Sequence, residues 1–261
     1  MIKLIASDLD GTLIPEGTQT IDPDFWGELE KLLEQGYLFY AASGRQYANM
    51  RRLFDGYADR MGFISENGAI VTEKEQLIFV DELPRKLMVS VAEDMIRFPE
   101  TEICLSGVRA CYIRPRTDWF ADQIENVLKN ATERFDDPAS IDDQIVKASV
   151  YIHDFDKNVS FIQSFLREKY GAQADFVTAG NGWLDMIMEG SGKGKALEFV
   201  MERQGISPEE VMVFGDNQND ISMLKLVSNS YAVESAKPEV RACASHTCES
   251  VSKILREFLK M

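Results

Sequence analysis

The sequence has no long hydrophobic run, little histidine or cysteine, and no excess of basic charge. None of its apolar stretches approaches the ~20 residues that a membrane-spanning helix requires. The N-terminus enters an apolar segment at once, without the basic region of a signal peptide. The two histidines and four cysteines, none at C-x-x-C spacing, argue against a zinc cluster and for reduced thiols. We therefore expect a cytoplasmic protein with no membrane role.

Acidic residues outnumber basic ones, with 43 Asp and Glu against 28 Lys and Arg, for a formal net charge of −15. A chain this acidic repels nucleic-acid backbones and anionic lipids, so neither is expected as a partner. A small phosphate would still bind where a metal ion and a lysine reverse the local field. The 261 residues suit one large domain or two smaller ones, and no obligate protein partner is evident.

The apolar run at residues 2–6 is typical of a strand buried on both faces of a parallel sheet, and it leads into Asp8-Leu9-Asp10-Gly11-Thr12. Because side chains alternate along a strand, Asp8 and Asp10 leave its tip on the same side. Two carboxylates held that close favour a bound cation or a shared proton. Strand tips are also where open α/β sheets bind ligands. This pattern predicts a metal-assisted acid–nucleophile pair. The alternative is that both are loop acids, one of them a helix cap.

A second apolar run, residues 37–42, ends in Ser43-Gly44-Arg45 just before a helical pattern. A serine and a glycine at a helix N-terminus are suited to binding an anion. Ser43 taken alone is explained equally well as an ordinary N-cap. Its position beside another strand tip that carries two acids favours phosphate binding.

The C-terminal part of the chain repeats this arrangement. A glycine-rich segment, residues 190–195, places Lys193 at a helix start, which suits an anion, although a solvated lysine is the alternative. The buried-strand run 211–214 then ends in a glycine, acid and amide cluster, residues 215–220, that includes Asp216, Asn219 and Asp220. Helix capping explains Asn219 or Asp220, but not the whole cluster.

Between these parts the pattern changes. Asn67-Gly68 predicts a turn that leads into a hairpin at residues 70–72 and 77–80. Residues 83–185 then form an α+β block that resembles an inserted domain. Within this block we expect helices at 87–96, 118–130 and 159–165, and strands near 103–105, 111–113, 148–152, 176–177 and 183–188. The terminal region after residue 235 is expected to be helical.

Taken in order, D-L-D-G-T, S-G-R, S-E-N-G-A, K-G-x-A-L and G-D-x-x-N-D resemble the motifs of the haloacid dehalogenase superfamily. The sequence looks most like its Cof-type subgroup, which carries a type IIB cap. The resemblance covers residues 1–82 and 186–261. It implies an α/β fold, in which these two segments form a Rossmann-like parallel-sheet catalytic core. Residues 83–185 would be an inserted α+β cap that determines substrate specificity.

The resemblance also implies an activity, that of a Mg²⁺-dependent phosphatase of a small phosphorylated metabolite, such as a sugar phosphate or a phosphorylated cofactor. Asp8 would be the nucleophile and form an aspartyl-phosphate. Asp10 would protonate the leaving alcohol and then activate water. Mg²⁺ would bind Asp8, the backbone carbonyl of Asp10 and Asp216.

Further residues have binding or supporting roles in the family's pattern. The resemblance implies that the phosphoryl oxygens are held by Ser43, Gly44 and Lys193. It assigns support of the site to Thr12, Asn219 and Asp220, of which the last two would order the metal site and the lysine. Lys195 does not fit the K-G-x-A-L frame, and we expect it to be dispensable.

Two other functions stay open at this point. An acid at Asp10 argues for phosphatase or phosphomutase chemistry, so a phosphosugar mutase is one alternative. The other is a non-catalytic phospholigand-binding protein, which would need neither Asp8 nor Asp10. The sequence does not name the substrate.

Overall fold

A computed structural model describes residues 1–15, 17–18, 20–128, 130–180 and 182–260. Contacts within the chain divide it into two compact units, one formed by Met1–Phe79 with Gly192–Met261 and the other by Val80–Ser191. None of the described helices is long and apolar enough to cross a membrane.

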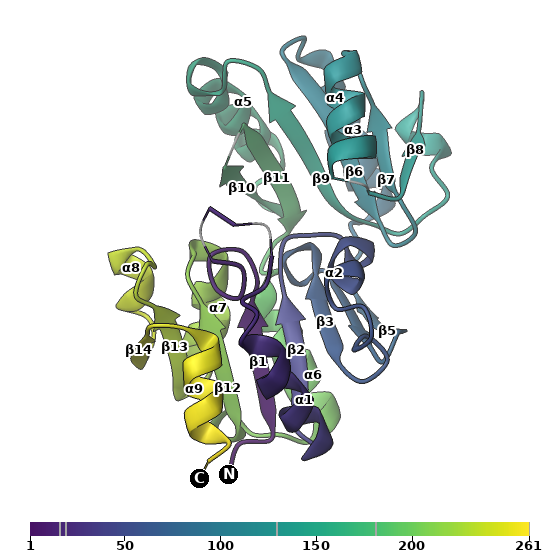
Figure 1. The fold of residues 1–261 in the computed structure, drawn as a ribbon. Coiled ribbons are helices and arrows are strands. Elements are labelled where there is room, and N and C mark those ends of the chain that lie inside the picture. Colours follow the sequence, from purple (N-terminus) through teal and green to yellow (C-terminus); the bar gives the residue numbers. More distant parts are fainter. Residues whose placement is uncertain (16, 19, 129, 181, 261) are drawn as a thin grey trace. The chain divides into compact units, whose positions relative to one another are not determined.

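The first unit is built on an eight-stranded sheet, in which the apolar runs of the sequence form the central strands (Figure 1). The strand order is β14-β13-β12-β1-β2-β3-β4-β5. β1 runs parallel to both β2 and β12, so the carboxyl ends of these strands lie at one edge of the sheet. The strands are β1 (Leu4–Asp8), β2 (Leu38–Ala42), β3 (Gly62–Ser65), β4 (Ile70–Glu73), β5 (Gln76–Val80), β12 (Val211–Gly215), β13 (Asn229–Val233) and β14 (His246–Cys248).

Helices cover this sheet, and most of their apolar faces are buried in one continuous core. Figure 1 shows α1 and α9 in front of the sheet, and Arg256 of α9 donates to Glu28 of α1 at 3.1 Å. The helices are α1 (Phe25–Glu34), α2 (Tyr47–Leu53), α6 (Lys193–Gln204), α7 (Ile221–Leu226), α8 (Pro238–Arg241) and α9 (Val251–Phe258). Short helical turns are η1 (Glu66–Gly68), η4 (Pro208–Glu210) and η5 (Gln218–Asp220).

The second unit has a six-stranded sheet of order β10-β11-β9-β6-β7-β8. α3 and α5 share a hydrophobic core with one face of this sheet. The strands are β6 (Thr101–Gly107), β7 (Cys111–Arg114), β8 (Thr132–Arg134), β9 (Ile145–Ile152), β10 (Ala174–Gly180) and β11 (Trp183–Met188). The helices are α3 (Arg85–Arg97), α4 (Asp118–Asp122) and α5 (Phe155–Tyr170), with turns η2 (Gln123–Val127) and η3 (Pro138–Ser140).

This architecture confirms the predicted fold class, and some element boundaries differ from those expected. The helix expected at 118–130 is α4 followed by the wider π-type turn η2, and the helix expected at 159–165 extends over Phe155–Tyr170. β8 and β14 were not expected. Both are three-residue edge strands with mostly exposed or half-exposed residues, so they lack the apolar alternation by which a strand is recognised.

Candidate active site

The tip of β1 places a carboxylate directly beside a buried lysine. Asp8, the last residue of β1, is 4% exposed, and Lys193, the first residue of α6, is fully buried. The Lys193 Nζ donates to Asp8 Oδ1 at 2.5 Å and to Asp220 Oδ1 at 2.7 Å. Since a buried ammonium requires compensating charge, these contacts explain why Lys193 tolerates complete burial.

The protonation of this pair is set by burial and by the neighbouring charges. Burial raises the pKa of Asp8 well above its usual range, and repulsion from Asp220 adds to the rise although Lys193 opposes it. Burial alone would lower the pKa of Lys193, but the carboxylates of Asp220 and Asp8 outweigh it and raise that pKa. The lysine is therefore a permanent positive charge at the tip of β1.

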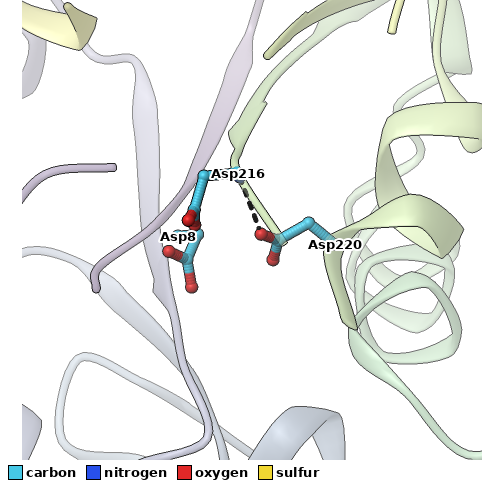
Figure 2. Close-up of side chains that lie close together, drawn as sticks. All are labelled: Asp8, Asp216 and Asp220. Carbon is cyan, nitrogen blue, oxygen red and sulfur yellow. Dashed lines mark hydrogen bonds between the residues drawn. The ribbon is translucent and has the colours of Figure 1, made fainter. Parts of the chain in front are cut away.

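Asp216, which follows β12, brings a further carboxylate to the same place (Figure 2). Its Oδ1 accepts a hydrogen bond from Thr12 Oγ1 at 3.2 Å. Burial, and then repulsion from Asp220, raise the pKa of Asp216. Asp220 is itself fixed, because its Oδ2 accepts from the backbone N–H groups of Asp216 and Asn217, each at 3.0 Å. The hydrogen bond from Thr12 thus joins the loop after β1 to the loop after β12.

The resulting acidic cluster has the composition of a site for a hard divalent cation. Each of Asp8, Asp216 and Asp220 offers a carboxylate oxygen, and these oxygens lie within 4.8 Å of one another. Asp8 Oδ2 is buried and has no hydrogen-bond partner in the described part of the chain. A side chain at Gly11, where φ is +90°, would meet Asp216 Oδ2 at 2.3 Å, so the loop after β1 approaches Asp216 closely. Clustered carboxylates with an unsatisfied oxygen fit Mg²⁺, which prefers oxygen ligands.

The Asp10 side chain lies outside this cluster and is about half exposed, with 52% of its surface accessible. Its carboxylate is paired with Arg45, whose Nε donates to Oδ2 at 2.9 Å and whose Nη2 donates to Oδ1. The Ser43 Oγ also reaches Asp10 Oδ2, at 3.4 Å. The structure therefore brings Ser43 to Asp10, with Arg45 as an additional partner that the sequence analysis did not single out.

Gly44 and Asn219 meet through a residue to which the sequence analysis gave no role, Asn67. The Asn219 Nδ2 donates to Asn67 Oδ1 at 3.0 Å, and a side-chain carbon at Gly44 would lie 2.9 Å from that same oxygen. The side-chain hydrogen bond described for Asn219 is the one to Asn67, and its expected role in ordering the metal site and the lysine stays a prediction. The sequence signals for Asn67 were its place in an Asn-Gly turn and in the S-E-N-G-A motif, neither of which assigned it a contact.

The fold and the site together define an α/β enzyme whose polar centre lies at the carboxyl ends of parallel strands. A family model described as haloacid dehalogenase-like hydrolase matches residues 5–254. The chain therefore belongs to the haloacid dehalogenase-like hydrolases, as its motifs predicted.

Relatives and a solved structure agree with this assignment. The chain is 30% identical over 264 residues to the 5-amino-6-(5-phospho-D-ribitylamino)uracil phosphatase YbjI of Escherichia coli (strain K12), covering 99% of this chain and 97% of the relative. It is 26% identical over 248 residues to the HMP-PP phosphatase of Yersinia enterocolitica (serotype O:8 / biotype 1B), covering 92% and 87%. The structure of the HAD subclass IIB sugar phosphatase BT4131 shares the fold, with a TM-score of 0.79, 22% identity and 98% of both chains covered. The expected enzyme class, a phosphatase of this family, is confirmed.

Proposed function

We propose that this chain is a Mg²⁺-dependent phosphatase that hydrolyses a small phosphorylated metabolite through an aspartyl-phosphate on Asp8. One observation carries the proposal. The Asp8 carboxylate is buried at the tip of β1, beside the carboxylate of Asp216. Its Oδ1 accepts from Lys193, and its Oδ2 has no hydrogen-bond partner among the described residues. A carboxylate buried in this way is oriented, and its free oxygen is available to a ligand.

In the first half-reaction, an oxygen of Asp8 forms a bond to phosphorus while the bond from phosphorus to the leaving alcohol oxygen breaks. Asp10 gives its proton to that alcohol. Asp10 is suited to proton exchange because its side chain is accessible to solvent, whereas Asp8 is buried. In the second half-reaction, Asp10 takes a proton from water, the water oxygen bonds to phosphorus, and the bond from phosphorus to Asp8 breaks. Inorganic phosphate leaves and Asp8 is regenerated.

Charge on the phosphoryl group is met by groups that are already fixed in place. Lys193 is held between two carboxylates, so it presents its charge without reorganisation. Ser43 and the amide of Gly44 would supply hydrogen bonds to the other phosphoryl oxygens. Mg²⁺, held by Asp8, the Asp10 carbonyl and Asp216, would supply positive charge that offsets the negative charge of the phosphoryl group. Within this scheme Thr12 holds Asp216 in place, and Asp220 holds Lys193.

The substrate class is inferred from the relatives together with the second unit. The relatives named above act, by their names, on a phosphorylated ribitylaminouracil and on HMP-PP. We infer a related kind of substrate here, a small phosphate ester of a sugar, a sugar alcohol or a cofactor precursor. We assign substrate selection to the second unit as a cap. Its bounds, Val80–Ser191, lie a few residues outside the expected 83–185.

A phosphate-release assay over several dozen phosphorylated metabolites, with p-nitrophenyl phosphate as a generic substrate, tests this function. We expect turnover with Mg²⁺, none with saturating EDTA, and recovery when Mg²⁺ is restored. Formation of an isomeric phosphosugar with little free phosphate would instead identify a mutase. Binding of phosphate esters without any turnover would contradict the proposal and identify a phospholigand-binding protein.

A further inference from the structure

The turn η1, residues Glu66–Gly68, contacts three segments of the first unit that carry candidate site residues. The sequence predicts a turn there, and the scheme above gives it no role. Its neighbours are the Ser43–Arg45 loop, the start of α6 at Lys193, and η5, which contains Asn219 and Asp220.

Backbone hydrogen bonds join the turn to the Ser43–Arg45 loop. The Asn67 N–H donates to Ser43 O and the Glu66 N–H donates to Arg45 O, both at 3.0 Å. The Ser43 N–H donates in turn to Ile64 O at 2.8 Å, just before the turn. Two carbonyls of the loop therefore accept hydrogen bonds from the turn, which fixes the peptide plane between Ser43 and Gly44 and the peptide plane that follows Arg45. The Asn67 side chain lies against Gly44, since a side-chain carbon there would be 2.9 Å from Asn67 Oδ1.

The same Asn67 oxygen joins the turn to η5. It accepts from Asn219 Nδ2 at 3.0 Å. Asn219 is followed directly by Asp220, whose Oδ1 accepts from Lys193 and whose Oδ2 accepts from the backbone of Asp216. The Asn67 amide therefore links the Ser43–Arg45 loop to η5. Asp220 of η5 is the residue that holds both Lys193 and Asp216.

Gly68 joins the turn to the start of α6. A side-chain carbon at Gly68 would meet Gly192 O at 2.3 Å and Lys193 N at 2.8 Å, and its φ is +101°. Only glycine allows the two backbones to approach this closely, in a conformation that other residues rarely adopt. The position of Lys193 along its helix axis is thus set against this turn.

The backbone of the turn is itself strained. Glu66 and Asn67 have φ of 50° and 59°, a left-handed conformation that asparagine tolerates and glutamate rarely adopts. Consecutive residues held in this way cost free energy and persist only where the surroundings determine them, which is a recurrent feature of functional sites.

We propose that the Glu66–Gly68 turn is a positioning element of the phosphoryl-transfer centre. Its Asn67 amide sets the spacing between the Ser43–Gly44 loop and the Asn219–Asp220 turn, and Gly68 sets the position of Lys193. The inference rests on the proposed function, because it concerns the same centre. Since the turn arranges groups that meet the charge of the transition state, its loss lowers kcat and leaves KM nearly unchanged.

The decisive variant is Asn67→Gly, which keeps the left-handed backbone accessible and removes only the amide. Its matched control is Lys74→Gly, a non-glycine residue at φ 49° in the β4–β5 turn of the same unit. We expect Asn67→Gly to lower kcat roughly 10- to 100-fold with KM changed less than about threefold. Affinity for orthovanadate with Mg²⁺, measured by calorimetry, should fall by a similar factor, and affinity for inorganic phosphate much less. Lys74→Gly should match the wild type in all of these.

Asn219→Ala removes the donor of the same hydrogen bond and leaves the Glu66–Gly68 turn unchanged. It therefore tests the role of this hydrogen bond even if Asn67→Gly does not fold. The effects of the two variants should be less than additive when combined, because they share one interaction. Equal vanadate affinity and kcat in wild type, Asn67→Gly and Asn219→Ala would overturn the inference. So would an equal loss in Lys74→Gly. A wild type that binds Mg²⁺ and vanadate but releases no phosphate would contradict the proposed function instead, and the vanadate affinities of the variants would still decide the role of the turn.

Discussion

Each unit of the molecule buries several carboxylates, and one from each unit, Asp94 and Asp8, differ in how their oxygens are hydrogen-bonded. In the second unit, Asp94 is 3% exposed, and both of its oxygens accept hydrogen bonds, Oδ1 from Arg97 and Oδ2 from Lys169 and Tyr170. In the first unit, Asp8 is 4% exposed and has one oxygen without a partner among the described residues.

We interpret this difference as one between a structural acid, Asp94, and the proposed nucleophile, Asp8. Asp94 lies on α3 and its partners Lys169 and Tyr170 lie on α5, so its buried charge joins two helices. Asp8 lies beside the carboxylates of Asp216 and Asp220, and its Oδ2 has no hydrogen-bond partner among the described residues. A buried polar group without a partner costs free energy that folding does not recover, unless a ligand completes it. Substitutions at the two sites should therefore have opposite effects on activity and stability.

The largest expected effect is on turnover in Asp8→Asn. We expect kcat to fall by at least about a thousandfold, because the amide cannot act as the nucleophile. Stability of the metal-free protein should stay the same or rise, because burial and then repulsion from Asp220 disfavour the negative charge of Asp8, and Asp220 still pairs with Lys193 in the variant. Phosphate release and thermal unfolding in EDTA measure the two effects. Unchanged turnover would mean that Asp8 is not the nucleophile.

Lys193→Met should lower both the stability of the protein and its turnover. Removing the ammonium leaves Asp8 and Asp220 buried without a counterion, which destabilises by about 3–5 kcal/mol, and kcat should fall about a hundredfold or more. Lys195→Met is the matched control, because Lys195 is exposed on the same helix and is expected to be dispensable. Urea unfolding and initial rates distinguish the two lysines. Equal losses of stability and kcat in the two variants would contradict the proposed role of Lys193.

Asp94→Asn should show the reverse of Asp8→Asn. The change weakens the hydrogen bonds from Lys169 and Tyr170, so we expect a loss of about 1–3 kcal/mol in the free energy of unfolding. Turnover at saturating substrate should stay within about twofold of the wild type, because the acid has no ligand to complete. Urea unfolding and kcat at a permissive temperature measure this. A collapse of kcat without loss of stability would place Asp94 in the catalytic machinery.

The gathering of the site could be anticipated because it follows from topology. The apolar runs at residues 2–6, 37–42 and 211–214 each end in a polar segment. Parallel strands bring such ends to one edge of the sheet. The proximity of Asp8, Asp216, Asp220 and Lys193 is a consequence of this order. The motifs that resembled the family were sufficient to name it.

Contacts between side chains of separate turns could not be anticipated in the same way. The pairing of Arg45 with Asp10 depends on where a long, flexible side chain comes to rest, which no periodicity encodes. The contact of Asn67 with Asn219 depends on the spacing of two loops in three dimensions. The Asn-Gly pair indicated a turn, but it gave no information on what the turn would meet.

The smallest expected effect is a contrast in pH dependence between the two regions of the metal-free protein. The pKa of Asp216 is raised in the folded state, so its contribution to stability is present at low pH and is lost as pH rises through that raised value. Burial acts to raise the pKa of Asp94, but hydrogen bonds from Lys169 and Tyr170 outweigh it and lower that pKa. Its contribution is therefore present above the usual carboxyl range and is lost as pH falls.

Urea unfolding in EDTA across this range should show the stability difference between wild type and Asp216→Asn decreasing as pH rises, and that between wild type and Asp94→Asn increasing. Parallel slopes for the two variants would remove the distinction between the two acids. Saturating Mg²⁺ should abolish the slope for Asp216→Asn alone, because the cation takes the place of the proton at the acidic cluster.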